Sequence, residues 1–94
     1  MFIVLLRFAQ RDRAAQAMQG HKQWLQRGFD DGVFVLAGSL QPDLGGAVVA
    51  HRTTRAALQE RVNEDPFVAE GVVRAEVLEI TPSRDDDRLK ELLA

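Results

Sequence analysis

The sequence has no cysteine, only three prolines and one tryptophan, and no apolar run long enough to cross a membrane. Without cysteine, a disulfide framework, a zinc-thiolate site, an iron-sulfur cluster and a cysteine nucleophile are excluded. The apolar start, Phe2 to Leu6, has no basic segment before it and is followed directly by Arg7. This pattern predicts a buried strand rather than a signal peptide or a membrane span. We therefore expect a cytoplasmic protein with no membrane partner.

A strongly basic stretch is absent as well. The chain has 12 lysines and arginines against 14 aspartates and glutamates, which gives a net charge of −2. Because no basic segment could neutralise a row of phosphates, nucleic acid is not an expected partner. The hydrophobic fraction of 46% is that of a folded protein. A length of 94 residues suffices for one domain with one core, but not for a deep cleft within one subunit, so we expect oligomerisation.

Hydrophobic periodicity predicts four strands, at about residues 2–8, 33–37, 47–50 and 73–79. Gly38-Ser39 closes the second apolar run and Gly45-Gly46 opens the third, so these two runs are expected to form a hairpin. The connection, residues 40–44, is too long for a tight two-residue turn and can adapt its shape or partly cover a pocket.

Two helices and a helical turn are expected between the strands. The first helix starts near Arg11, runs for about twenty residues, and ends where Gly32 can take the left-handed conformation. Thr53 or Thr54 caps the second helix, which stops before Asp65. From Asp65 to Gly71, an aspartate cap, a proline at the first helical position and a glycine exit predict a separate helical turn.

The resulting order, β-α-β-β-α-β, is the ferredoxin-like split βαβ arrangement of the α+β class. In it, two helices cover one face of a four-stranded antiparallel sheet. Residues 1–82 form this domain, and residues 83–94 form a helical extension that packs weakly on its own domain or contacts a partner. The other face of so apolar a sheet must also be buried, and a second copy packed sheet against sheet is the simplest solution. We therefore expect a homodimer.

His21 is the first candidate for chemistry, because it lies on the apolar stripe of the first helix. A buried imidazole needs hydrogen-bond partners, and a backbone carbonyl would satisfy that need without any function. The preceding Gly20 favours the functional alternative. Glycine inside a helix costs about 1 kcal/mol relative to alanine, and close approach of another segment or a ligand would compensate for it.

Asp65 is the second candidate, and capping of the short helix explains it completely as a structural residue. The two roles are compatible. A carboxylate that reached His21 would fix its tautomer and stabilise the imidazolium, which is a common way to build a general base.

The remaining candidates have weaker patterns. Ser39 and Gly38 end a strand where a hydroxyl or an amide could face a ligand, although such residues more often only terminate the strand. Arg7, near the end of the first strand, could bind an anionic substrate, and Phe67 belongs to the Asp65 turn. His51 is expected to face solvent. The three aspartates at 85–87 are expected to be a solvated helix start, so no metal and no cofactor are expected.

Taken together, these residues resemble the YCII-related domain family, whose small members have the ferredoxin-like fold and form dimeric α+β barrels. The matching pieces are the opening strand at 1–6, His21-Lys22-Gln23-Trp24-Leu25, residues 32–39, Gly45-Gly46, and Asp65 to Val73. The resemblance implies an active site built around His21 and Asp65, in a pocket between the sheet and the first helix. Where the family commonly has Gly-Pro, this chain has Gly38-Ser39. Most of the family's reactions are unassigned, and one branch resembles a dehydrochlorinase that acts on a chlorinated hydroxyquinol.

Two functions are therefore open. In the first, His21 oriented by Asp65 is a general acid or base on a small metabolite, in a lyase, isomerase or dehydrohalogenase step without metal or organic cofactor. The expected catalytic residues are His21 and Asp65, and the expected substrate-binding residues are Arg7, Gly38, Ser39 and Phe67. In the second, the protein is a non-catalytic dimeric module that binds a small ligand or serves as an accessory subunit, with His21 and Asp65 in structural roles.

Overall fold

The computed structural model describes residues 1–93, and its elements follow the predicted order of strands and helices. The elements are β1 (Phe2–Phe8), a 3₁₀ turn (Arg11–Arg13), α1 (Ala14–Asp30), β2 (Phe34–Leu40), β3 (Gly45–Ala50), α2 (Arg55–Asn63), α3 (Pro66–Ala69), β4 (Val73–Glu79) and α4 (Asp87–Leu93).

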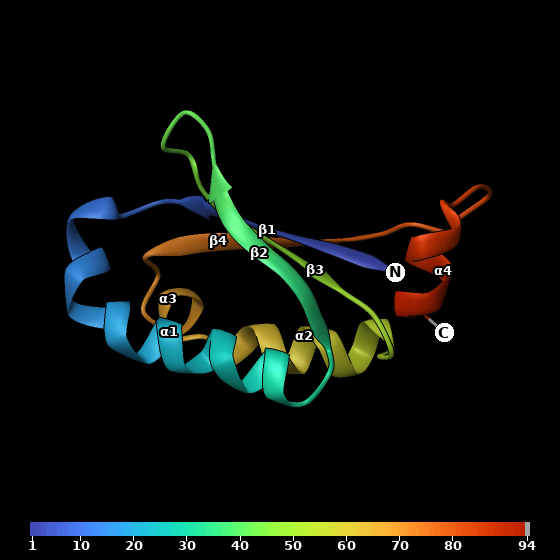
Figure 1. Ribbon diagram of the computed structural model, residues 1–94. Coiled ribbons are helices and arrows are strands. Elements are labelled where there is room, and N and C mark those ends of the chain that lie inside the picture. The colour runs from blue at the N-terminus through green and yellow to red at the C-terminus, as the bar shows by residue number, and fades with distance from the viewer. Residues whose placement is uncertain (94) are drawn as a thin grey trace.

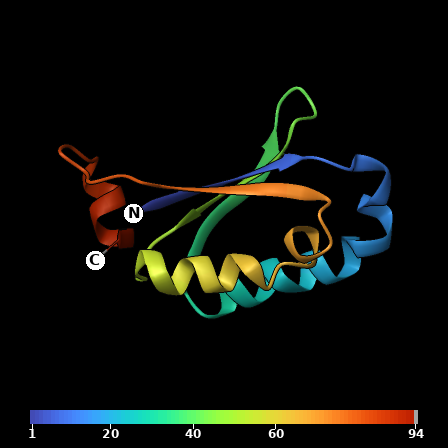
Figure 2. The ribbon, with the colours of Figure 1, turned by 180° about the vertical axis from the view of Figure 1, so that it is seen from behind.

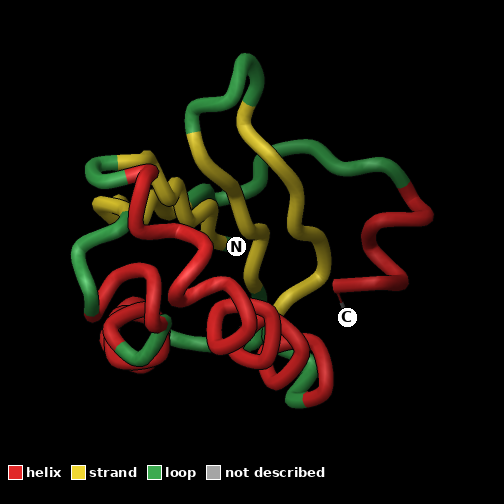
Figure 3. The backbone as a smooth tube through the Cα atoms, turned by 90° about the vertical axis from the view of Figure 1, so that its left-hand side faces the viewer, coloured by secondary structure: helices red, strands yellow, loops and turns green. Residues whose placement is uncertain are grey.

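The four strands form one antiparallel sheet in the order β2-β3-β1-β4. Helices α1, α2 and α3 lie together against one face of this sheet (Figure 1), and the view from behind shows the same layer (Figure 2). Seen along the sheet, the helices form one layer and the strands the other (Figure 3). This confirms the ferredoxin-like α+β fold.

Alternation along β1 separates the two faces of the sheet. Phe2, Val4 and Leu6 are buried beneath the helices, whereas Ile3 and Leu5 point to the opposite face and are only partly buried. On that opposite face, a row of paired residues crosses all four strands: Leu36, Val49, Ile3 and Leu78. This row of the face without helices is therefore apolar, as the strand sequences predict, whereas the Arg7–Glu76 ion pair lies on the same face.

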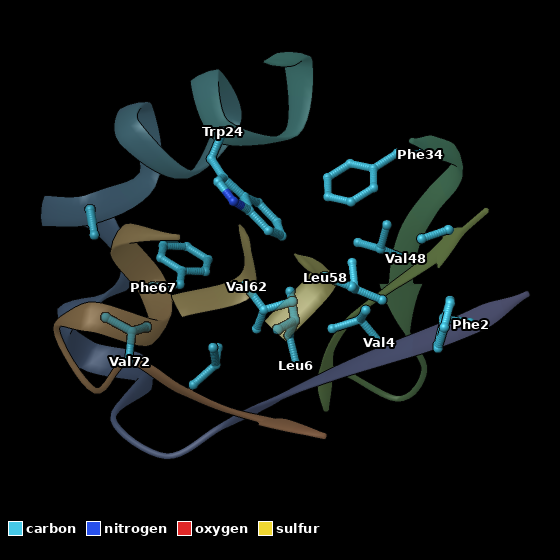
Figure 4. Close-up of a cluster of buried hydrophobic side chains, with 13 residues drawn as sticks. Phe2, Val4, Leu6, Trp24, Phe34, Val48, Leu58, Val62, Phe67 and Val72 are labelled. Carbon is cyan, nitrogen blue, oxygen red and sulfur yellow. The ribbon is translucent and has the colours of Figure 1, made fainter. Parts of the chain in front are cut away.

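The core fills the space between the sheet and the helices, and Trp24 points into it from α1, between Phe67 and Phe34 (Figure 4). Trp24 is 1% exposed, and its indole N–H donates a 2.8 Å hydrogen bond to the carbonyl of Arg61 in α2. Its ring meets Phe34 edge-on at a centroid distance of 5.1 Å. Trp24 thus joins α1, α2 and β2 around one buried ring.

The helix ends follow the predicted local chemistry. Gly32 has a φ of 73°, the left-handed conformation that ends α1. Thr54, rather than Thr53, caps α2, because its side-chain oxygen accepts a hydrogen bond from the backbone N–H of Ala57. Asp65 caps α3, and Pro66 occupies the first turn of that helix.

Two expectations about the strands at 33–51 were wrong. The hairpin strands reach past the glycine and serine residues predicted to end them, so only residues 41–44 form the loop, which rises away from the helices (Figure 1). Backbone pairing of Ser39 with Gly46 carries the ladder through this region. His51, predicted to face solvent, is 8% exposed, because the backbone pairing between the segments of β2 and β3 continues through it: its N–H donates a 2.9 Å hydrogen bond to the carbonyl of Val33.

Helix α4 lies beyond the end of the sheet, beside the N-terminus (Figures 1 and 2). Asp86 precedes it and accepts hydrogen bonds from the side chain and the backbone N–H of Arg88. These bonds, the side-chain bond foremost, hold the pKa of the Asp86 carboxyl below its ordinary value. Across residues 1–93, no helix has the length and apolarity needed to span a membrane.

Candidate active site

His21 and Asp65, which are 44 positions apart in the chain, are in direct contact. His21 Nδ1 lies 2.8 Å from Asp65 Oδ1. The His21 side chain is 13% exposed and the Asp65 side chain is fully buried. Burying a carboxylate away from water costs free energy unless hydrogen-bond donors contact it. The contact with His21 therefore stabilises Asp65 in its buried position.

A glycine brings the two segments together. A Cβ atom added to Gly20 would lie 2.9 Å from Cγ of Pro66, which is closer than packed side chains come. Because residue 20 has no side chain, α1 approaches the start of α3 at this point, and the neighbours His21 and Asp65 meet. The predicted compensation for a glycine inside the helix is therefore the close approach of another chain segment.

The Asp65 carboxylate has two donors on one oxygen and none on the other. Oδ1 accepts from His21 and, at 3.0 Å, from the backbone N–H of Phe67. Oδ2 is buried and has no hydrogen-bond partner within residues 1–93. An unpaired buried oxygen costs about 1 to 3 kcal/mol. The burial of this charge therefore depends on His21 and on the first turn of α3.

The hydrogen bond to Asp65 determines the tautomer of the neutral His21 ring. A carboxylate only accepts hydrogen bonds, so the proton of the neutral imidazole is on Nδ1 and the lone pair is on Nε2. The Phe67 ring stacks on the imidazole at a centroid distance of 4.0 Å and an interplanar angle of 6°. Asp65 and Phe67 together hold the ring in one orientation.

A cavity of about 320 Å³ opens beside His21, between α1 and the sheet. Its floor includes three neighbouring residues of one cross-strand row, Ser39, Gly46 and Leu6. Since Gly46 lacks a side chain, it leaves space in the cavity between Ser39 and Leu6. The lining residues are Leu6, Phe8, Met18, His21, Lys22, Leu25, Ala37, Gly38, Ser39, Gly45, Gly46, Ala47, Val48, Phe67 and Val73. Nδ1 is engaged by Asp65, so Nε2 is the nitrogen available to a molecule in this cavity.

The profile of the YCII-related domain matches residues 1–82. The chain belongs to this family. Among proteins with curated descriptions, none matches it. One solved structure with the same fold is 5-chloro-2-hydroxyhydroquinone dehydrochlorinase (TftG) from Burkholderia phenoliruptrix AC1100, in complex with 2,5-dihydroxybenzoquinone. The sequences are 12% identical, the TM-score is 0.63, and the match covers 86% of this chain and 94% of that one.

This YCII-related domain brings most of the predicted site residues together. His21, Gly38, Ser39 and Phe67 line the cavity, and Asp65 lies behind His21. Arg7 is elsewhere: it does not line the cavity, and its side chain forms a 3.0 Å ion pair with Glu76 of β4. The alternation of β1 explains this, because Leu6 and Phe8 face the cavity and the residue between them faces the other side of the sheet.

Lys22 is a cavity residue that the sequence pattern missed. Lys22 was not among the predicted site residues, yet it lines the cavity with Met18, His21 and Leu25. These four residues have the spacing 0, 3, 4 and 7, which is one helix face. Within residues 1–93, no three acidic or histidine side chains gather in a way that could hold a metal ion.

Proposed function

We propose that this YCII-related protein is a cytoplasmic, cofactor-independent enzyme that uses His21 and Asp65 for general acid/base chemistry on a small metabolite. The observation that carries the proposal is the 2.8 Å contact between Nδ1 of His21 and Asp65, with His21 at the wall of a cavity of about 320 Å³. A histidine with one nitrogen held by a carboxylate and the other facing an open pocket is the arrangement of a general base. A histidine that serves only as a structural link would be enclosed in a filled core.

The proposed reaction begins with Nε2 accepting a proton from a carbon or hydroxyl group of the substrate. The electron pair of the broken bond forms a new double bond, and a leaving group departs with the electron pair of its own bond, as halide does in a dehydrohalogenation. Asp65 stabilises the imidazolium formed in this step. The proton then returns to product or solvent. Lyase and dehydrohalogenase reactions consist of such steps, and in an isomerase the proton returns to another atom of the substrate in place of the departure of a leaving group.

The cavity fits substrates of about one ring. Its volume is at the lower end of the range for small-molecule sites, and its walls are mainly apolar. The fold is shared with TftG, a dehydrochlorinase crystallised with a single-ring quinone. This supports a single-ring substrate for the present chain, with Gly38, Ser39 and Phe67 as binding residues.

A non-catalytic ligand-binding or accessory module is the alternative function. It is favoured by the structural roles of Asp65, which caps α3, and of Phe67, which stacks on His21. Such a module would use the same cavity without proton transfer. The two functions differ in their dependence on the charge of Asp65.

An Asp65→Asn variant tests the proposal. The backbone N–H of Phe67 and Nδ1–H of His21 both donate to one oxygen, so the Asn side chain keeps the cap and the tautomer but loses the charge. Charge-assisted hydrogen bonds are about twice as strong as neutral ones, so we expect kcat to fall about 10- to 100-fold. Turnover is measured on a panel of hydroxylated and chlorinated single-ring compounds that includes 5-chloro-2-hydroxyhydroquinone.

Asp31→Asn is the control for this experiment, because Asp31 pairs with Arg61 at 2.9 Å and does not line the cavity. It should leave kcat unchanged. Circular dichroism establishes that both variants are folded. Equal kcat for Asp65→Asn and the parent, or binding without turnover of any panel compound, would favour the non-catalytic module.

We also propose that the protein is a homodimer joined through the face of the sheet without helices. In the row that crosses this face, Leu36 is 58% exposed and Leu78 is 41% exposed. Light scattering should give twice the 10.5 kDa chain mass at micromolar concentration. Leu36→Glu would bury a charge between the sheets and should shift the mass toward a monomer. Gln23→Glu on α1 is the control, and a monomeric parent protein would contradict the proposal.

A further inference from the structure

Lys22 is the charged residue among those that line the cavity, and its charge is positive. His21 is the other basic residue of the lining, and no aspartate or glutamate belongs to it. The carboxylate of Asp65 lies behind the His21 ring, is fully buried and does not line the cavity. The chain as a whole has a net charge of −2, so its overall charge does not attract anions. Any preference for an anionic ligand must therefore come from the cavity wall.

Lys22 is available to a ligand. Its side chain is exposed and lines the cavity, which places it at the rim. Within residues 1–93 it has no ion pair and no hydrogen bond. The chain's other lysine, Lys90, behaves differently, since it lies within 4 Å of two acidic partners, Asp85 at 3.6 Å and Asp87 at 3.9 Å. Of the two lysines, only Lys22, the one at the cavity, thus has an ammonium group without an acidic partner within residues 1–93.

Lys22 directly follows His21 on the cavity face of α1. Because both side chains line the same cavity, one ligand can contact Nε2 of His21 and the ammonium group of Lys22. The remaining walls are apolar, with Leu6, Phe8 and Leu25 among them. Such a site suits a flat apolar body with one anionic oxygen.

We infer that the cavity selects small aromatic or enolic anions, such as carboxylates and ionised hydroxyl groups on a ring, and that Lys22 determines this selectivity by binding the anionic oxygen. The inference rests on the proposed function, because it concerns the ligand of the same site. Ser39, whose hydroxyl has no partner within residues 1–93, supplies a neutral hydrogen bond from the floor of the cavity. In this binding mode the anionic oxygen of the ligand contacts Lys22, and the proton that is transferred faces Nε2 of His21.

Calorimetric titration with 2,5-dihydroxybenzoate and its neutral amide, 2,5-dihydroxybenzamide, tests this selectivity. The two probes have the same ring and differ in charge. We expect the parent protein to bind the acid at least 10-fold more tightly than the amide, as a charge-assisted contact in a partly open site provides. Lys22→Met should lower the affinity for the acid about 10-fold and leave the affinity for the amide unchanged. Lys22→Arg should restore the preference.

Lys90→Met is the matched control, because it removes a lysine that does not line the cavity and should leave both affinities unchanged. Equal binding of acid and amide by the parent, or no binding of either at millimolar concentration, would overturn the inference. So would a preference that survives in Lys22→Met, since His21 would then provide it. The titration requires no turnover, so it fails or succeeds independently of the kinetic test on Asp65.

Discussion

A His21→Gln variant is expected to lose about 100- to 10,000-fold in kcat, the range that a positioned general base contributes. Glutamine has an amide N–H that can donate to Asp65 Oδ1, so the buried carboxylate keeps a donor in place of Nδ1. It has no basic nitrogen to replace Nε2. The loss therefore reports proton transfer rather than collapse of the site. Steady-state kinetics on a compound that the parent turns over measures the effect.

The control for this variant is His21→Ala, which removes the donor as well as the base. The fully buried Asp65 carboxylate then keeps only one hydrogen-bond donor within residues 1–93, the backbone N–H of Phe67. We expect an additional loss of about 1 to 3 kcal/mol in the free energy of unfolding, and about 4 to 8 °C in the melting temperature for each kcal/mol. A His21→Gln variant as active as the parent would refute the catalytic proposal. An unchanged melting temperature for His21→Ala would exclude the structural role.

The fold could be predicted closely because each helix and strand is indicated by residues within or next to that element. Alternation in β1 and β4, the long stripe of α1 and the cap at Asp65 each lie within a few residues of the elements they define. The errors fell where local signals are weak. Gly38 and Ser39 resemble a strand end, but they continue β2 because the backbone of β3 pairs with theirs, and backbone pairing does not depend on side-chain type.

Most members of the candidate site could be predicted from the sequence, but their arrangement in space could not. His21 and Asp65 each have a sufficient local explanation, and their contact depends on the packing of Gly20 against Pro66, 46 positions away in the sequence. Lys22 was not predicted as a site residue because a charged residue on an amphipathic helix usually faces solvent. A long lysine side chain can extend along an apolar wall while its ammonium stays at the rim. Arg7 lies between two cavity residues, Leu6 and Phe8, in the sequence. Its side chain nevertheless faces the other side of the sheet, because successive residues of a strand point to opposite faces.

Gly28→Ala is expected to have the largest effect on stability. A Cβ atom at residue 28 would lie 2.0 Å from Cδ2 of Phe34, far inside the separation of about 3.5 to 4.0 Å at which two carbon atoms pack. Phe34 is 3% exposed and packs against Trp24 and Phe29, so its ring has no free space to enter. Overpacking of a core typically costs about 1 to 3 kcal/mol, and an overlap of this depth should reach or exceed the upper value.

The gain in helix propensity from glycine to alanine, about 1 kcal/mol, offsets only part of that cost. Since a domain of this size has about 5 to 15 kcal/mol in total, the net loss should lower the urea midpoint clearly. Gly38→Ala is the matched control, because its added Cβ would meet nothing within 4 Å. In the double variant Gly28→Ala/Phe34→Leu, the smaller side chain makes room for the methyl group. The two changes should therefore destabilise less together than the sum of their separate effects, and additive effects would show that the ring of Phe34 is not what excludes the methyl group.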